Sequence, residues 1–406
     1  MKCLFLTNEF PPNIYGGAGV HVDYLTRELA KLVEVEVRCF GSHPEPQTLS
    51  SGRLSATAYG ADTSRYGAPR QLHSIFGALQ RGLDWNSAGV DADLVHLHTW
   101  YTHMGGILAK LNYGIPLVLT VHSLEPLRPW KREQLGRGYD FSCWVERTAI
   151  EMADAVVAVS SDTRADVLRL FNVQPEKVHV INNGIDLDEY RKKESTAALR
   201  KYGVDPDRPY LLFVGRITRQ KGIIHLAQAI RHMGRDFQVV LCAGAPDTEE
   251  IALEMQAAVS EAQTRHGGVI WIREMVEKQE IIELYSHAAV FCCPSVYEPF
   301  GIINLEAMAC DTPVVASAVG GIKEVVVDEE TGILVPLELR PGTFEPLDAE
   351  RFEKGLADGV NRLMADPVLR ARMGSAGRAR AEALFSWKAI ARRTLDLYAG
   401  LLEARR

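Results

Sequence analysis

The sequence predicts an α/β protein made of two doubly wound, Rossmann-like domains. Three observations support this fold class. The chain has 406 residues, too many for one ordinary hydrophobic core. Short β-branched runs alternate with helical patterns along most of it, as in parallel sheets covered on both faces. A charged, Asp- and Pro-containing segment near the middle separates two such series.

In the first half, each apolar run is followed by a turn or a helical pattern. We expect strands at residues 2–8, 33–40, 93–99, 116–122, 155–160 and 177–183. Residues 43–70 are polar and rich in Gly, Ser and Pro, and they are interpreted as a long loop.

The segment 186–209 is charged and ends in a turn before a new strand at 210–216, which makes it the best domain boundary. We therefore predict domains over 1–190 and 205–385. The remaining strands of the second domain are expected at 237–244, 268–274, 290–295, 313–317 and 332–336, and the final helices at 349–365, 367–384 and 387–403.

Charge and composition exclude several classes of protein. The formal net charge of −7 opposes binding to nucleic acid and stable association with an anionic membrane. The apolar run at the N-terminus is too short for a signal peptide, and the sequence has no run of 18 apolar residues. A cytoplasmic protein is therefore expected. The seven cysteines have no metal-binding spacing, which favours buried thiols in a reducing compartment.

A glycine loop follows the first strand. Gly16, Gly17 and Gly19 resemble the start of a dinucleotide fingerprint, but Val22 stands where the third glycine belongs. The second strand also ends without a ribose-binding acid, so a nicotinamide or flavin enzyme is disfavoured. Bare amides before a helix could meet an anion, and a purely structural turn remains the alternative.

Two cations follow the first strand of the second domain, in GRITRQKG (215–222). Arg216 ends the strand and Lys221 precedes the next helix, so both belong to the carboxyl edge of the sheet. A planar guanidinium and a compact ammonium suit a diphosphate. A solvated turn would have the same letters, and that reading stays open.

Two acids flank a strand-to-helix junction in SVYEPFGIINLE (295–306). Glu298 lies in the loop, where Pro299 keeps it out of the α conformation, and Glu306 lies more than one turn inside the helix. They are therefore not expected to share a proton. Each could instead accept hydrogen bonds from different hydroxyls of one ligand, while the free amides of residues 301–303 face an anion.

Metal sites are not expected. The D-x-D at 91–93 precedes a strand and is interpreted as a turn. His96, His98, His103 and His122 are assigned to different elements or to opposite strand faces. His122 alone is a candidate site residue, because it ends a strand at the sheet edge.

A basic cluster follows that strand, with an aromatic residue on either side of its centre. It could be a solvated face, a patch for anionic lipid or a pocket for a phosphorylated acceptor, and its place after a strand end favours the pocket. Its members are Arg128, Lys131, Arg132 and Arg137, with Trp130 and Tyr139.

Together these motifs resemble the retaining GT-B glycosyltransferases that include bacterial glycogen and sucrose-phosphate synthases. The glycine loop, GRITRQKG and EPFGIINLE, the family's E-x7-E, span essentially the whole chain. The runs DADLVHLHTWY, THMGG and VHSLEPLRPWKREQLGRGYDFSCWVERTA are similar to the actinobacterial-type glycogen synthase branch, the α-maltose-1-phosphate synthases.

The resemblance implies the GT-B fold, with the two domains facing a central cleft and a last helix at 386–406 packing back on the N-terminal, acceptor-binding domain. The domain over 205–385 would bind the nucleotide sugar. Glu298 would bind the donor sugar, Glu306 the ribose, and Arg216 and Lys221 the diphosphate. The implied catalytic residues are His122, Arg216, Lys221 and Glu298. The implied donor-binding residues are Gly16, Gly17, Arg216, Lys221, Glu298, Phe300, Gly301, Ile302, Ile303 and Glu306. The implied acceptor-binding residues are Arg128, Lys131, Arg132, Arg137 and Tyr139.

The implied reaction is α-1,4-glucosyl transfer from ADP-glucose to glucose 1-phosphate or to an α-glucan end, in glycogen synthesis. No cofactor and no metal are expected, and same-face attack is the hypothesis for retention. Ile14 replaces the lysine of larger glycogen synthases, which leaves room for a phosphorylated acceptor. Sucrose-phosphate-like or phospholipid mannosyl transfer, and a silent sugar-nucleotide sensor, remain alternatives. A homodimer is left open.

Overall fold

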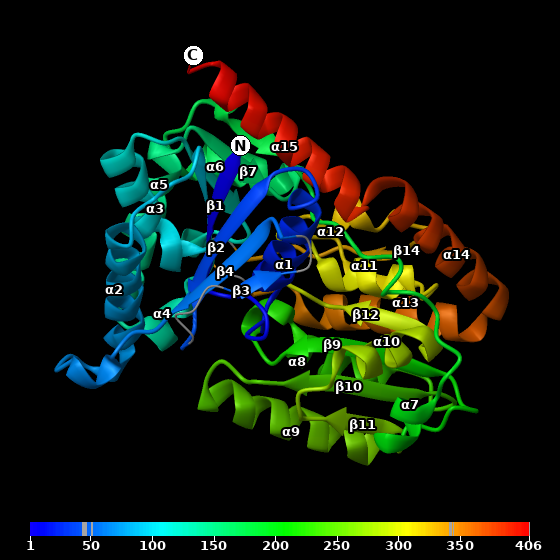
Figure 1. Ribbon diagram of the computed structural model, residues 1–406. Coiled ribbons are helices and arrows are strands. Elements are labelled where there is room, and N and C mark those ends of the chain that lie inside the picture. The colour runs from blue at the N-terminus through cyan, green and yellow to red at the C-terminus, as the bar shows by residue number, and fades with distance from the viewer. Residues whose placement is uncertain (43–46, 50–51, 341–342, 344, 406) are drawn as a thin grey trace. The chain divides into compact units, whose positions relative to one another are not determined.

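The computed structural model describes residues 1–42, 47–49, 52–340, 343 and 345–405 (Figure 1). The chain divides into two compact units, Met1–Gly184 with Trp387–Arg406, and Ile185–Ser386. The first unit thus takes its last helix from the end of the chain. The charged segment that follows Gly184 belongs with the second unit.

The first unit contains one sheet, in the order β3-β4-β2-β1-β5-β6-β7-β8. All neighbouring strands are parallel except β3, which pairs antiparallel with β4. The strands are β1 (Lys2–Leu6), β2 (Glu34–Phe40), β3 (Gln47–Leu49), β4 (Leu54–Tyr59), β5 (Leu94–His98), β6 (Leu117–Val121), β7 (Ala155–Ala158) and β8 (Val178–Val180).

Helices cover this sheet, and the chain's last helix packs against its first (Figure 1). The ring of Trp387 stacks on Tyr24 of the first helix, with centroids 5.8 Å apart. The helices of the first unit are α1 (Gly17–Leu29), α2 (His73–Ser87), α3 (Trp100–Tyr113), α4 (Lys131–Leu135), α5 (Gly138–Met152), α6 (Ser161–Leu170) and α15 (Trp387–Glu403).

The prediction of a loop over 43–70 is wrong in part. Strand β4 extends the sheet beside β2, and β3 adds an edge. Leu54 and Ala56 are buried, but Ser55, Thr57 and Ala58 around them are small or polar. Such residues give a weak period-2 signal, so the strand resembles loop sequence. Residues 43–46, 50 and 51 of the predicted loop lie outside the described residues.

The second unit contains a fully parallel sheet in the order β11-β10-β9-β12-β13-β14. Its strands are β9 (Tyr210–Arg216), β10 (Gln238–Gly244), β11 (Val269–Ile272), β12 (Val290–Cys293), β13 (Val314–Ser317) and β14 (Gly332–Val335). Its helices are α7 (Ala197–Lys201), α8 (Ile223–Ala229), α9 (Glu249–Arg265), α10 (Lys278–His287), α11 (Ile302–Ala309), α12 (Ile322–Val325), α13 (Ala349–Ala365) and α14 (Pro367–Leu384).

The predicted strands are present but shorter at their ends. Strand β1 stops at Leu6 rather than at residue 8, and β12 stops at Cys293 rather than at 295. The polar residues trimmed from these ends begin the loops at the carboxyl edge of each sheet. Strands β5 and β6 are buried along their whole length, so the loops that follow them begin at fixed positions along this edge.

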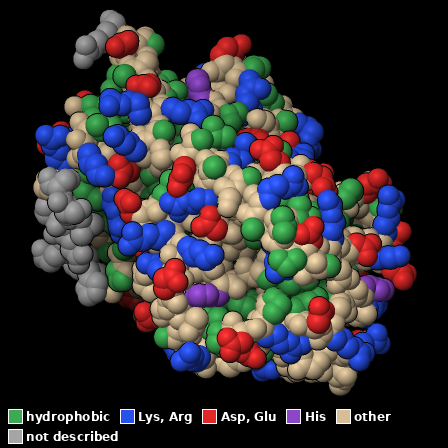
Figure 2. All heavy atoms as spheres, turned by 90° about the vertical axis from the view of Figure 1, so that its right-hand side faces the viewer, with side chains coloured by type: hydrophobic (Ala, Val, Ile, Leu, Met, Phe, Trp, Pro, Cys, Tyr) green, Lys and Arg blue, Asp and Glu red, His purple; other side chains and the backbone are tan. Residues whose placement is uncertain are grey.

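The face shown in Figure 2 carries acidic and basic side chains side by side, in keeping with the small net charge. In the described part of the chain, no helix is both long and apolar enough to span a membrane.

Candidate active site

In the second unit, Lys221 and Glu298 form an ion pair at the carboxyl edge of the sheet. Lys221 Nζ lies 2.6 Å from Glu298 Oε2, and the two side chains are 22% and 9% exposed. The Ser295 hydroxyl also donates to this carboxylate. Burial alone would lower the pKa of Lys221, but the nearby carboxylate of Glu298 outweighs it and raises that pKa. The lysine is therefore a fixed cation at neutral pH.

Two glycines bring the Lys221 and Glu298 loops together. Gly222 has φ +60°, and a Cβ there would lie 2.0 Å from the carbonyl oxygen of Pro294. Gly320 has φ +50°, and its Cβ would lie 2.0 Å from the carbonyl oxygen of Glu298. Only glycine permits both the left-handed backbone and these close approaches. The loop that carries Glu298 is thus clamped from both sides.

Arg216, at the end of β9, is paired with Asp247 in the loop that follows β10. Asp247 is the more buried partner, with 11% of its side chain exposed against 39% for Arg216. Strands β9 and β10 are neighbours, so their ends place these side chains at the same edge of the sheet as Lys221. Asp247 fixes the direction of the guanidinium but also offsets its charge.

Glu306, inside α11, has a different environment from Glu298. Its carboxylate accepts hydrogen bonds from the hydroxyls of Tyr190 and Tyr285, at 3.1 and 3.0 Å. It is buried, and this burial raises its pKa although both tyrosines oppose the shift. The two glutamates therefore have separate partners, and they do not form an acid/base couple.

Helix α11 begins between the two glutamates. Gly301, at φ +94°, is the N-cap of α11, so the amides of Ile302 and Ile303 precede the first intrahelical bond. The Phe300 side chain is 2% exposed and packs near Phe385, so only its backbone is available to a ligand. These amides and Lys221 lie at one sheet edge and suit an anion.

In the first unit, the glycine loop already holds a carboxylate. Glu9 Oε2 accepts hydrogen bonds from the amides of Tyr15 and Gly16, at 3.0 and 2.8 Å. Helix α1 starts at Gly17 with Gly16 as its N-cap. The amide of Gly16 is thus directed to Glu9 rather than outward, and Gly17 begins the amides that have no intrahelical partner.

The expectation that the histidines lie on different elements or on opposite strand faces is wrong for His96 and His98. His96 and His98 are two residues apart on β5, so they share one face, and their ring centroids are 4.4 Å apart. His98 Nδ1 lies 2.9 Å from His122 Nε2, since β5 and β6 are neighbours. His21, on α1, lies beside them. One ring nitrogen from each of His21, His98 and His122 lies within 4.8 Å of the other two.

This histidine cluster is electrically neutral at physiological pH. Burial and the neighbouring histidines lower the pKa of His122 and His98 well below the usual value, and burial lowers that of His21 to about 4. His21 is held by Asn183, whose side-chain oxygen lies 2.6 Å from Nδ1. His122, only partly buried at the end of β6, is thus a neutral hydrogen-bonding group in a set position.

Comparison with known proteins decides the family. The glycosyltransferase family 4 model matches residues 15–189, and the glycosyl transferases group 1 model matches residues 194–380. The chain is 49% identical to α-maltose-1-phosphate synthase of Mycolicibacterium smegmatis, over 98% of this chain and 99% of that protein. This chain belongs to the GT-B glycosyltransferase family that contains the α-maltose-1-phosphate synthases.

Other members of this GT-B family match over similar lengths. The chain is 30% identical to D-inositol 3-phosphate glycosyltransferase of Xylanimonas cellulosilytica, over 96% of this chain and 93% of that one. Among solved structures, sucrose-phosphate synthase of Thermosynechococcus elongatus superposes with a TM-score of 0.80 at 26% identity, covering both chains fully. The predicted family and fold class are thereby confirmed.

In this GT-B glycosyltransferase, two arginines of the predicted basic cluster are paired with neighbouring acids. Arg132 forms an ion pair with Asp140, at 2.6 Å, and its guanidinium lies over the Tyr139 ring. Arg128 lies 3.4 Å from the buried carboxylate of Glu125. The Tyr139 hydroxyl donates to the Glu125 carbonyl and is buried, while Arg137 is exposed. The acceptor role of this cluster stays a prediction.

The acidic D-x-D lies in the loop that precedes β5, at the opposite edge of the sheet. Asp93 accepts the Lys2 amide at 2.7 Å, and Asp91 lies 3.6 Å from the Lys2 ammonium. Both acids precede β5, whereas the glycosyltransferase site follows the strand ends. In the basic cluster, Lys131 Nζ donates to the side-chain oxygen of Gln134 at 2.8 Å.

Sequence reasoning missed Asp247, Gly320 and Glu9. Asp247 could have been found, because it follows the strand next to β9 and so shares its edge. Gly320 and Glu9 act through backbone contacts made by distant or folded-back loops, for which spacing along the chain gives no signal.

Proposed function

We propose that this glycosyltransferase transfers glucose from ADP-glucose to glucose 1-phosphate or to an α-glucan end, with retention of configuration. The second unit would bind the nucleotide sugar and the first the acceptor. The likeness to α-maltose-1-phosphate synthases across nearly the full chain supports the choice of acceptor and product class. Soluble, cytoplasmic action without a metal cofactor is part of the proposal.

One observation carries the donor assignment: Lys221, Arg216 and the start of α11 lie at a single sheet edge in the second unit. As the anomeric bond breaks, negative charge grows on the diphosphate leaving group. Fixed cations and helix amides stabilise that charge without rearranging, which is how such groups lower a barrier. They would supply what a divalent metal supplies in other transferases.

The carboxylates would position the donor. Glu298, locked against Lys221, would accept hydrogen bonds from sugar hydroxyls, and Glu306, held by two tyrosines, would accept from the ribose. In the first unit, His122 would contact the transferred glucose as a neutral donor or acceptor. Because both glutamates are already engaged, we favour same-face attack over a carboxylate nucleophile.

The test is incubation of the full chain with a panel of nucleotide sugars and acceptors. Nucleoside diphosphate release and product mass would be followed for ADP-, UDP- and GDP-sugars with glucose 1-phosphate, glycogen, fructose 6-phosphate and inositol phosphate. We expect ADP-glucose with glucose 1-phosphate to give an α-linked disaccharide phosphate. Failure of ADP-glucose with both glucose 1-phosphate and glycogen would refute the specific function but leave the family unchanged.

A further inference from the structure

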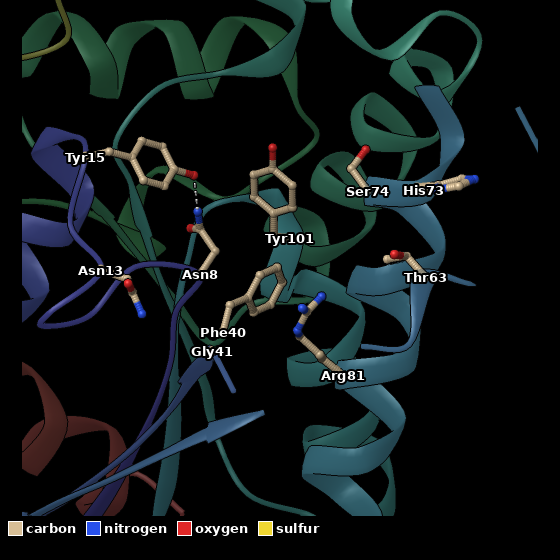
Figure 3. Close-up of a pocket in the computed structure, with 10 residues that line it drawn as sticks. All are labelled: Asn8, Asn13, Tyr15, Phe40, Gly41, Thr63, His73, Ser74, Arg81 and Tyr101. Carbon is tan, nitrogen blue, oxygen red and sulfur yellow. Dashed lines mark hydrogen bonds between the residues drawn. The ribbon is translucent and has the colours of Figure 1, made fainter. Parts of the chain in front are cut away.

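A cavity of about 440 Å³ opens in the first unit, at the carboxyl edge of its sheet (Figure 3). Asn8 and Tyr15 of the loop that follows β1 form one wall, and Arg81 and Ser74 of α2 lie on the other side (Figure 3). Phe40, at the end of β2, and Tyr101, of α3, lie between them. This volume is in the range of sites that hold one small molecule.

Arg81 is the only Lys, Arg, Asp or Glu side chain among the described residues that line the cavity. Its Nε donates to the carbonyl of Tyr59 at 2.8 Å, and Nη1 donates to the carbonyl of Gly77 at 3.1 Å. The guanidinium lies 4.1 Å from the centre of the Phe40 ring. These contacts fix its direction, and no carboxylate of the described chain forms an ion pair with it.

Arg81, which forms no ion pair in the described part of the chain, contrasts with two other arginines at this edge of the unit. Arg132 is paired with Asp140, and Arg128 with Glu125. Burial disfavours the charged guanidinium and lowers the pKa of Arg81, although Tyr66 and Asp84 oppose the shift. A bound anion would remove that penalty, and a rigid, planar fork is the group best suited to phosphate oxygens.

The remaining polar groups of the cavity suit a sugar rather than a bare anion. Ser74 Oγ is buried and has no hydrogen-bond partner in the described part of the chain. Asn8 donates to the Tyr15 hydroxyl at 2.9 Å, which places an amide and a phenol side by side on the opposite wall (Figure 3). Buried hydroxyls without partners are costly unless a ligand or water satisfies them.

We propose that this cavity binds a hexose phosphate, with its phosphate against Arg81 and Ser74 and its hydroxyls towards Asn8 and Tyr15. The inference rests on the proposed function, whose phosphorylated acceptor it places here instead of at the basic cluster that follows β6. The cavity lies beside β1 and β5, and His122 follows β6, the next strand. A phosphosugar bound here would therefore lie at the same edge as the histidine.

The experiment measures binding of glucose 1-phosphate to the full chain by calorimetry in the presence of ADP. Arg81→Gln removes the charge, Arg81→Lys keeps it without the fork, and Ser74→Ala removes a hydroxyl that has no hydrogen-bond partner in the described part of the chain. Arg164→Gln is the matched control, since Arg164 also donates to two backbone carbonyls, those of Val178 and Pro175, but on α6. Glucose and inorganic phosphate serve as reference ligands, and thermal melts check folding.

We expect Arg81→Gln to weaken glucose 1-phosphate binding by tens of fold, Ser74→Ala by several-fold and Arg81→Lys by an intermediate factor, as charged hydrogen bonds do. Arg164→Gln should bind as the unchanged protein does, and glucose should bind weakly throughout. Equal affinity in Arg81→Gln and Arg164→Gln, or a loss seen only when Lys131 and Arg132 are both changed to Glu, would overturn the assignment.

Transfer kinetics separate this inference from the proposed function. If the chain transfers glucose from ADP-glucose, Arg81→Gln should raise the KM for glucose 1-phosphate and leave the KM for ADP-glucose unchanged. Normal KM values in that variant would overturn the assignment of the cavity as a hexose phosphate site but would leave the proposed function unchanged. Conversely, Arg81-dependent binding without transfer from ADP-glucose would refute the function and keep the cavity as a hexose phosphate site.

Discussion

Lys221 Nζ lies 2.6 Å from Glu298 Oε2, across 77 positions of sequence. The pair is mostly buried, so removing one partner leaves the other as an uncompensated charge. It also means that the lysine is held in place before any substrate arrives. In the proposed function, the same ammonium would face the diphosphate while its carboxylate partner faces the sugar.

Lys221→Ala should lower kcat by about 100- to 1000-fold, because the growing charge on the leaving group loses its fixed cation. Donor turnover would be measured with purified full-length variants. Arg231→Ala is the matched control, since Arg231 pairs with the buried Glu353 at 3.0 Å in the same unit. Similar losses in both variants, or near-normal turnover in Lys221→Ala, would remove the leaving-group role.

Gly320→Ala should impair donor binding far more than its backbone strain explains. Its Cβ would lie 2.0 Å from the Glu298 carbonyl oxygen, so the Glu298 loop must move. Gly203→Ala is the control, because Gly203 also has positive φ, +74°, but nothing lies within 4 Å of its Cβ. We expect each to lose about 1 kcal/mol of unfolding free energy from strain. Only Gly320→Ala should also raise the KM for the donor; equal KM values would contradict the clamp.

Glu306→Gln should stabilise the free protein at alkaline pH and should weaken binding of the nucleotide-sugar donor. Burial raises the pKa of Glu306, so the native state binds more protons than the unfolded state above the ordinary value near 4.5. Stability from this group is therefore lost as the pH rises through the raised pKa. Removing the charge should increase the unfolding free energy at pH 8 by on the order of 1 kcal/mol, measured with urea.

The same Glu306→Gln variant should show a higher donor KM with a smaller change in kcat, because a ribose acceptor is lost. Tyr285→Phe is the companion variant, since it removes one hydrogen bond to the carboxylate and keeps its charge. A destabilised Glu306→Gln at pH 8, with unchanged donor KM, would contradict both the burial penalty and the ribose role.

The histidine cluster should make the protein acid-sensitive below pH 6.5. Burial lowers the pKa of His21, in the cluster, to about 4, and that of His103, a separate buried histidine on α3, to about 3. Their stabilising contribution is fully present above the unfolded value near 6.5, and it is lost as the pH falls towards the folded values. Each histidine can contribute up to about 1.4 kcal/mol per pH unit across that range.

His21→Gln should therefore flatten the slope of unfolding free energy against pH between 6.5 and 4, measured by urea titration at several pH values. The control is His287→Gln, a change in the second unit at a partly exposed imidazole. A slope that stays the same in His21→Gln would show that this imidazole is not buried in its neutral form.

Treatment with a chelator should leave transfer unchanged, because in the proposed function Lys221 and Arg216 would take the place of a metal at the diphosphate. Rates after EDTA dialysis would be compared with rates after adding Mg²⁺ or Mn²⁺. Rescue of Lys221→Ala by either ion would fit charge replacement. A chelated protein that is inactive until metal is restored would contradict the metal-free proposal.

Much of the fold could be read from local sequence, and the reasons are visible in particular elements. Strands such as β6 and β9 are mostly apolar because both of their faces are buried, and Trp387–Glu403 has a clear amphipathic pattern. Strand β4 could not be read, because its small and polar residues lie at the sheet's margin. Local hydrophobicity measures burial, and β4 is buried only in part.

The candidate site was predictable where it follows from strand ends. Arg216, Lys221, Glu298 and His122 all lie at the carboxyl edges of the sheets, as parallel topology requires. The groups around Glu306 and the Gly16 amide were not predictable, since Tyr190, Tyr285 and Glu9 come from other loops and helices. That His96 and His98 share one face of β5 does follow from the sequence, because they are two residues apart on one strand.

The assignment of Trp387–Arg406 to the first unit has a consequence for biogenesis. Residues 1–184 leave the ribosome long before α15 is made, and that helix supplies Trp387 against Tyr24 and the Tyr398 hydroxyl against His96. During translation, the N-terminal unit therefore exposes part of its core until α15 has been synthesised. The second unit has all of its sequence by Ser386, so it can finish folding before the first unit does.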